Sequence, residues 1–227
     1  RFMKFLFKVF ICFLFVTISN RASSDIFFSE YKVSTSGIRI GELVWNLNID
    51  QYKYLIEVNL NSSGFFSGLF NFGGHYVSSG LIENGLFVPV SYNQKWKTRK
   101  KNREINMVFE NNKVVVLKQS PKEVGKQRIN FENLFGYSDP LTSILKLLNN
   151  SSESKTIDGR RVYIISLNKI SEGQNKKIYS IKDYNNIWAD HKRNDLEQII
   201  IMTNSNKYLP EAIHINFKGQ LFKIEKN

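Results

Sequence analysis

Apolar and polar residues alternate through most of this chain, and the alternation is clearest between Tyr31 and Leu60. Tight turns at Ser36-Gly37 and Asp50-Gln51 divide that stretch into segments in which every second residue is apolar. A period of two places successive side chains on opposite faces of a β-strand. The stretch therefore predicts three antiparallel strands, each with one buried face.

The middle segment of this stretch changes phase. Ile38 and Ile40 share one face, but after Gly41 the apolar residues occupy the odd positions 43–49. A β-bulge at Gly41-Glu42 would absorb this slip and bend the strand. A bent strand helps a sheet to curl, so we expect a curved sheet.

Further alternating segments follow at short intervals and bring the total to about a dozen strands. Pro89 lies inside one of them and indicates a bulge or a sheet edge at that point. The segments lie at about 75–82, 86–97, 104–110, 113–119, 161–169, 177–184, 196–203, 211–218 and 220–225.

One segment has the period of a helix. Asp139 is a good N-cap, Pro140 suits the first helical position, and apolar residues recur at i, i+3, i+4 and i+7 from Leu141 to Leu148. Strands without intervening helices favour an antiparallel sheet. We therefore predict a mainly β protein, a curved antiparallel sheet or incomplete β-barrel, with one α-helix at about 139–148 and a short helical turn at about 64–71.

The first 24 residues have the pattern of an export signal. From Met3, two lysines precede the apolar run Val9–Ile18, and small residues follow at Ala22-Ser23-Ser24. The run is shorter than the roughly 20 residues that span a bilayer. We expect residues 1–24 to be a cleaved signal peptide and residues 25–227 a single β-rich domain; an uncleaved anchor and a core helix are the alternatives for the first segment.

Cys12 is the only cysteine, and it lies within the apolar run. The remaining chain would contain no thiol, which excludes a disulfide framework, a thiol nucleophile and a zinc–thiolate site. An exported protein without disulfides suits the bacterial periplasm, and we expect a periplasmic location.

The chain is basic, with a net charge of +12. After residue 24 there remain 28 basic and 20 acidic residues, a net charge of +8. Such a charge favours anionic partners, for example lipid headgroups or another anionic surface of the cell envelope. Nucleic acid is not expected as a partner of an exported protein.

Several short motifs occur in an order typical of one family. They are Tyr31-x-Val33, Gly37-Ile38, Ile40-Gly41, Tyr52, Ser63-Gly64-Phe65, Ser79-Gly80-Leu81, Pro89, Tyr92, Asp139-Pro140-Leu141-Thr142, Asp158-Gly159-Arg160-Arg161 and Leu209-Pro210. Together they resemble the exported bacterial proteins of domain-of-unknown-function family 3108, over nearly the whole chain after residue 24. The resemblance implies a signal peptide, a curved antiparallel β fold with a helix and a Gram-negative cell envelope, and it transfers no catalytic residue. That fold is similar in outline to the incomplete barrels of periplasmic lipid carriers, an analogy of fold alone.

An aromatic segment supplies the first candidate site. Its residues have the spacing of one helical face, and glycines flank it. It would act as an apolar lid over a ligand cavity, or as a helical turn that plugs one end of the sheet, which is the commoner role of such a stripe. The candidate ligand-binding residues are Phe65, Phe66, Leu69, Phe70 and Phe72.

A basic connector supplies the second candidate, a contact with an anionic surface. Basic residues near such a surface attract it, and a tryptophan beside them suits a membrane interface. The alternative is a solvated hairpin tip that prevents edge-to-edge aggregation. The residues are Lys95, Trp96, Lys97, Arg99, Lys100, Lys101 and Arg103.

The motif Asp158-Gly159-Arg160-Arg161 supplies the third candidate. Arg160 or Arg161 would bind a carboxylate or phosphate through a two-pronged contact. The alternative is an Asp-Gly turn that leads into a strand, with both arginines paired to acidic side chains.

Catalytic and metal-binding signals are weak. Asp190-His191 with Asp195 is the one acid–imidazole cluster in the sequence, and it lies in a charged connector. Metal-ligand spacing, a Gly-x-Ser-x-Gly motif, a phosphate loop and a dinucleotide fingerprint are all missing from the sequence. We therefore predict no catalytic residue, metal or cofactor.

Three functions stay open on this basis. The leading hypothesis is a non-enzymatic binding or carrier module for an apolar or amphiphilic envelope ligand such as a lipid. The second is a structural or assembly partner of the envelope, and the third is an envelope hydrolase that uses His191.

Overall fold

The computed structural model describes residues 24–63, 71–171, 175–188 and 195–227. Within these ranges the protein is mainly β, with one α-helix, as the sequence predicts. The helical turn predicted at about 64–71 falls almost entirely outside the described residues. The elements are β1 (Asp25–Thr35), β2 (Ile38–Ile49), β3 (Lys53–Ser62), β4 (Phe72–Glu83), β5 (Leu86–Thr98), β6 (Asn102–Glu110), β7 (Lys113–Ser120), the 3-10 turn η2 (Phe131–Asn133), α2 (Pro140–Leu148), β8 (Glu153–Ile157), β9 (Arg161–Ile170), β10 (Lys176–Asn186), β11 (Leu196–Met202), β12 (Ala212–Phe217) and β13 (Gln220–Lys226).

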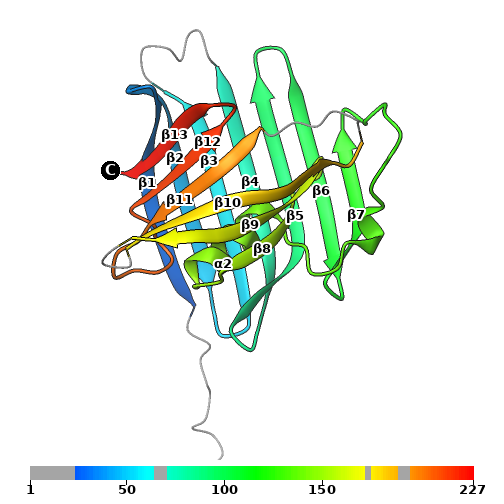
Figure 1. Cartoon of the computed structure of the whole chain (residues 1–227), viewed down its shortest axis with the longest axis horizontal. Helices are drawn as coiled ribbons and strands as arrows, with labels where there is room; N and C mark the ends of the chain where they lie inside the picture. The colour runs from blue at the N-terminus through cyan, green and yellow to red at the C-terminus, as the bar shows by residue number, and fades with distance from the viewer. Residues whose placement is uncertain (1–23, 64–70, 172–174, 189–194) are drawn as a thin grey trace, which may run out of the picture.

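All thirteen described strands belong to one sheet, in the order β7-β6-β5-β4-β3-β2-β1-β13-β12-β11-β10-β9-β8. Each pair of neighbours is antiparallel, and the ladder is not closed because β7 and β8 do not pair. The sheet curls so strongly that β8–β13 cross in front of β1–β4 (Figure 1). Helix α2 contacts β8 from one layer and β4 and β5 from the other, so it closes one end of the curl.

Register shifts lie on β2, where the sequence predicts a bulge, and on β5, where Pro89 predicts a bulge or an edge. On β2, Val33 of β1 pairs with Gly41 and Ser34 pairs with Arg39, which leaves Ile40 as the extra residue. The phase slip is therefore confirmed, one residue before the expected position. On β5, the register likewise shifts beside Pro89, which lies inside the sheet and not at an edge.

Strand β8 was not predicted, because the side chains on its buried face are hydroxyls. Ser154 and Thr156 are buried, and both lie within hydrogen-bonding distance of the Ser143 hydroxyl of α2, at 3.0 and 2.8 Å between oxygens. A polar run beside a helix gives no period-two hydrophobic signal, although its buried side is fully satisfied by hydrogen bonds.

The segment that joins η2 to α2 touches both edges of the sheet. Phe135 forms a bridge with Lys113 of β7, and Ser138 forms a parallel bridge with Thr156 of β8. The Ser138 amide donates to the Lys155 carbonyl at 2.9 Å. This edge-joining segment therefore connects the two outer strands, which do not pair with each other.

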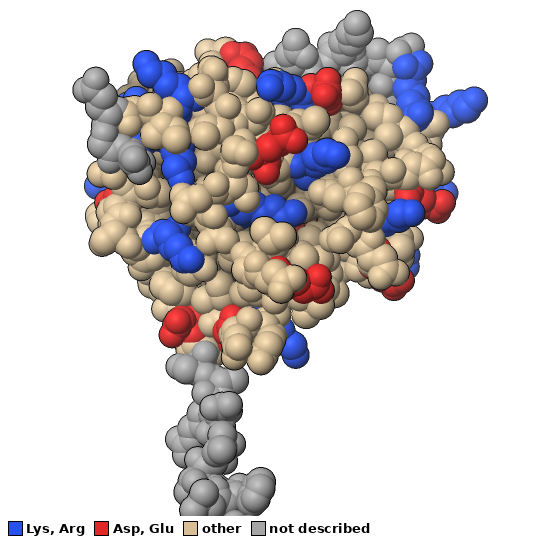
Figure 2. Space-filling view, turned by 60° about the horizontal axis from the view of Figure 1, so that its bottom comes forward, with Lys and Arg blue, Asp and Glu red and all other residues tan. Residues whose placement is uncertain are grey.

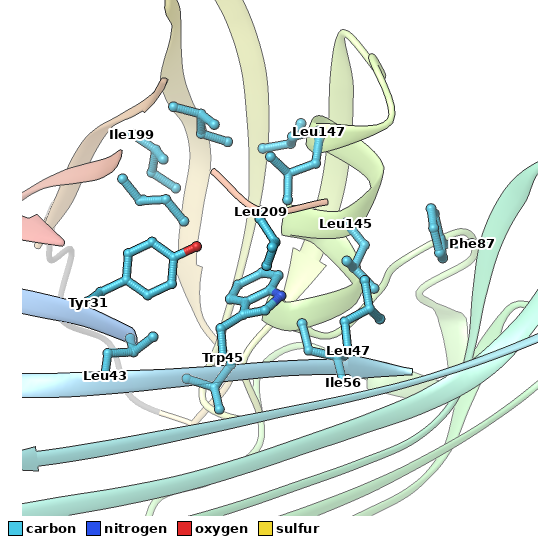
Figure 3. Close-up of a cluster of buried hydrophobic side chains, with 14 of the residues drawn as sticks. Tyr31, Leu43, Trp45, Leu47, Ile56, Phe87, Leu145, Leu147, Ile199 and Leu209 are labelled. Atoms are coloured by element: carbon cyan, nitrogen blue, oxygen red, sulfur yellow. The ribbon is translucent and has the colours of Figure 1, made fainter. Parts of the chain in front are cut away.

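The main hydrophobic core lies between the two layers, against α2 (Figure 3). Leu145 and Leu147 of the helix point toward Trp45, Leu47 and Ile56 of the long strands. All of these side chains are less than 4% exposed, and burial of each large apolar side chain stabilises the fold by about 1.5–3 kcal/mol.

Buried polar groups fix the start of α2 to the sheet. The Asp139 carboxylate accepts hydrogen bonds from the Leu141 and Thr142 amides, each at 3.0 Å. Its second oxygen accepts from the Thr142 hydroxyl at 2.5 Å and the Ser78 hydroxyl at 2.9 Å. Burial raises the pKa of Asp139, and these hydrogen bonds lower it in part. The predicted N-cap is thus also the anchor of the helix on β4.

Candidate ligand site: a basic recess joined to an apolar cavity

A recess of about 600 Å³ lies at the end of the curl away from α2. It is bounded by the β5–β6 turn, the segment after β7 and the β8–β9 turn. We call it the basic recess, because its charged lining residues are Lys100, Lys101, Arg103, Lys122, Arg160 and Arg161 against Glu104, Glu123 and Asp158. The recess thus brings together the basic connector and the Asp-Gly-Arg-Arg motif, which the sequence presents as separate candidates.

The β8–β9 turn holds its arginines through Asp158. The Asp158 side chain accepts hydrogen bonds from the Arg160 and Arg161 amides at 2.8 and 2.7 Å. Gly159 adopts a φ of +87°, and a Cβ there would lie 2.6 Å from the Ile105 side chain of β6. The Asp-Gly turn predicted from the sequence is therefore present, and only glycine fits against β6.

The same turn is tied to the far edge of the sheet. The Gly159 carbonyl accepts hydrogen bonds from the Gln119 side chain of β7 and from the Trp188 indole, the latter at 3.3 Å. Because Gln119 and Gly159 both line or flank the recess, the wall of the recess is fixed by side-chain contacts between the two sheet edges.

Both arginines of the turn pair with acidic side chains, as the structural interpretation of the motif expects. Arg160 pairs with Glu123. The Arg161 guanidinium lies 3.3 Å from the Asp195 carboxylate, 3.8 Å from Asp158 and 5.6 Å from the centre of the Tyr184 ring. Its Nε is buried without a hydrogen-bond partner in the described structure. Arg161 is thus fixed in place and retains an unused donor.

Arg103 faces these two arginines from β6. Burial lowers the pKa of Arg103, the positive charges of Arg160 and Arg161 lower it further, and the negative charge of Glu123 raises it in part. In the described part of the chain, Lys100, Lys101 and Arg103 form no ion pair. Elsewhere the charge is mixed: on the face turned forward in Figure 2, basic and acidic side chains are interspersed. The recess therefore holds more cationic than acidic side chains, and its arginines lie close enough to one another to interact.

A second cavity, of about 360 Å³, lies inside the curl next to the recess. We call it the apolar cavity, because leucine, isoleucine, valine and aromatic side chains from both layers dominate its lining. Gln94, Asp158 and Arg161 line both spaces, so the recess and the apolar cavity meet at these side chains.

Four tyrosines, Tyr76, Tyr92, Tyr163 and Tyr184, surround the apolar cavity. Burial raises the pKa values of Tyr76, Tyr92 and Tyr163, so their phenols stay neutral at physiological pH. The cavity wall is therefore uncharged except at the junction with the recess.

The remaining candidates lie in different places. Phe72 of β4 stacks on Trp96 of β5, with ring centres 5.6 Å apart and planes 13° apart, so this tryptophan packs against the protein. Lys95 and Lys97 are exposed on β5, outside the recess, and Lys95 lies 3.8 Å from Glu104. Arg99 is exposed in the β5–β6 turn and does not line the recess. Phe65, Phe66, Leu69, Phe70, Asp190 and His191 fall outside the described residues.

Sequence reasoning did not select Gln94, Gln119 or the cavity tyrosines. A neutral amide has no pattern of its own in a strand, and the tyrosines follow the same alternation as any core residue. Their shared parity with neighbouring buried residues is the one signal that places them on the inner face.

Two further features do not occur in the described ranges of the chain. No helix there is long and apolar enough to cross a membrane. No group of three or more histidine, cysteine or acidic side chains in the same ranges is placed to hold a metal ion.

Comparison with known proteins identifies a family. No curated protein matches the sequence. Among solved structures, the chain is similar to a β-barrel-like protein of domain of unknown function DUF1849 from Brucella abortus, with 9% identity, a TM-score of 0.48 and coverage of 88% of this chain and 95% of that one. Residues 30–188 match the family described as "Protein of unknown function (DUF3108)", and the chain belongs to this family.

Proposed function

We propose that the protein is a non-enzymatic binding or carrier module of the bacterial periplasm, and that it holds an amphiphilic envelope ligand. The apolar part of the ligand occupies the apolar cavity, and its polar end lies in the basic recess. The observation that carries this proposal is the junction: Gln94, Asp158 and Arg161 line both spaces, so one molecule can occupy both.

The size and lining of the cavity support a small-molecule ligand. Ligand pockets commonly measure about 300–1,000 Å³ and combine an apolar wall with a few polar groups that fix orientation. The apolar cavity, at about 360 Å³, has such a wall and is polar mainly where it meets the recess. This arrangement matches a molecule with one apolar and one charged end.

The experiment uses the exported protein and the apolar fluorescent probe N-phenyl-1-naphthylamine. We expect saturable binding with increased fluorescence. Leu60→Trp, which fills the apolar cavity from β3, reduces binding by about tenfold or more, because it removes the space the probe needs.

The matched control is Leu55→Trp, on the opposite face of the same strand, where the side chain is 46% exposed. It leaves probe binding unchanged. Thermal unfolding checks that both variants fold. If Leu60→Trp does not fold, Leu196→Phe takes its place, because it fills the same cavity from β11. Equal probe binding by the cavity variants and the control contradicts the proposed function.

A further inference from the structure

We propose that the ligand is a single-chain amphiphile with a phosphate monoester head, and that Arg103 and its neighbours in the basic recess bind the phosphate. This inference rests on the proposed function and specifies the chemistry of its ligand.

The charge of the recess selects a dianion. Its described lining holds six cationic and three acidic side chains. Glu123 and Asp158 each face an arginine of the β8–β9 turn, and Glu104 faces Lys95, outside the recess. The cations at 100, 101, 103 and 122 remain in excess. A carboxylate head would neutralise one of them, whereas a phosphate monoester carries about −1.5 to −2 at neutral pH.

The types of side chain also favour phosphate. Arg103 and the two arginines of the turn face the same space from two separate elements. Guanidinium groups present paired N–H donors that match the oxygens of phosphate, and several such groups can share one tetrahedral head. Lys100 and Lys101 add point charges from the turn above.

The apolar cavity limits the other end of the ligand. Its volume, about 360 Å³, lies near the lower limit for small-molecule pockets. That space favours one alkyl or prenyl chain over the paired chains of a membrane phospholipid. Arg161, held by Asp158 and Asp195, marks the point where the chain ends and the head begins.

The test is displacement of the bound fluorescent probe by dodecyl phosphate, by dodecanoate and by inorganic phosphate. We expect dodecyl phosphate to act at a concentration about tenfold lower than dodecanoate, because of the additional charge-assisted hydrogen bonds. Arg103→Gln removes most of this preference. Lys113→Gln makes the same change in net charge at the other end of the β6–β7 hairpin and leaves the preference intact.

Other outcomes overturn the inference separately from the proposed function. Equal displacement by dodecyl phosphate and dodecanoate rejects phosphate selectivity, while the binding function stands. Inorganic phosphate binding as tightly as dodecyl phosphate identifies a site for free phosphate and rejects the amphiphile. If the probe does not bind at all, calorimetric titration with dodecyl phosphate tests the inference directly. Binding heat that is smaller in Arg103→Gln supports the inference, and no binding heat in the original protein rejects it.

Discussion

The two ends of the curled sheet differ in how their polar groups are paired and in how tightly their side chains pack. At the end closed by α2, the buried polar atoms of Asp139, Thr142 and Ser78 hydrogen-bond to one another, and leucines fill the space between the layers. At the other end, Arg103 lines the basic recess near Arg160, Arg161 and Glu123, and the apolar cavity adjoins this recess. Satisfied polar groups stabilise a fold, whereas mutually repelling ones are costly unless a counter-charge arrives. The end at α2 therefore stabilises the fold, and the other end carries the proposed ligand site.

The largest effect on stability is expected from shortening apolar side chains of α2, one in the filled core and one at the apolar cavity. Leu145 is completely buried in the core, and Leu141 of the same helix is half-buried and lines the apolar cavity. We expect Leu145→Ala to reduce the free energy of unfolding by about 2–5 kcal/mol, because it creates a cavity in a filled core. Leu141→Ala costs about 1 kcal/mol, since its surroundings are already open.

Urea unfolding of both variants measures the difference. Equal losses of unfolding free energy would show that the side chains at the apolar cavity are packed as tightly as those in the core, and the two ends would then not differ in packing.

A smaller effect on the free energy of unfolding is expected from substituting Asp139, and this effect depends on pH. Burial raises the pKa of this carboxyl above its ordinary value of 3.8, so the folded protein holds the proton more strongly than the unfolded chain does. Its contribution to stability is present at low pH and decreases as the pH rises through the interval between the unfolded and folded values.

Asp139→Asn keeps an N-cap and does not titrate. We therefore expect the stability of Asp139→Asn to improve relative to the original protein as the pH rises from about 4 to about 7, while Asp139→Ala is less stable than the Asn variant by about 1–2 kcal/mol throughout. Unfolding curves at several pH values measure this trend. A constant gap between the Asn variant and the original protein would contradict it.

The smallest effect is expected in the recess. Glu123→Gln removes the acidic partner of Arg160 and makes that guanidinium available to a ligand. We expect two- to threefold tighter binding of dodecyl phosphate, roughly the effect of one partly exposed charge, and little change in stability. Calorimetric titration measures the affinity, and Glu132→Gln, on η2 outside the recess, is the control. Unchanged affinity would show that Arg160 does not contact the head.

The sequence predicted most of the strands and the helix, because alternation and capping are local signals. The phase slip before Gly41 and the N-cap Asp139 lie within a residue or two of where pattern alone placed them. Strand β8 has no such signal, because Ser154 and Thr156 occupy positions on its buried face where other strands carry apolar side chains.

The sequence predicts several residues of the candidate site, but it does not predict that they lie together. Arg103 and Arg160 were each selected, but their common location depends on the curl of the whole sheet, which no local pattern encodes. Gln94, at the junction with the apolar cavity, carries no signal of its own in the sequence.

The edge-joining segment has a consequence for association between molecules. Long sheets with free edges invite edge-to-edge pairing, and from there aggregation. Here Phe135 and Ser138 occupy positions on β7 and β8, the two outer strands of the sheet. A short connection between η2 and α2 therefore covers one position on each outer strand against pairing with another molecule, and it does not line the basic recess.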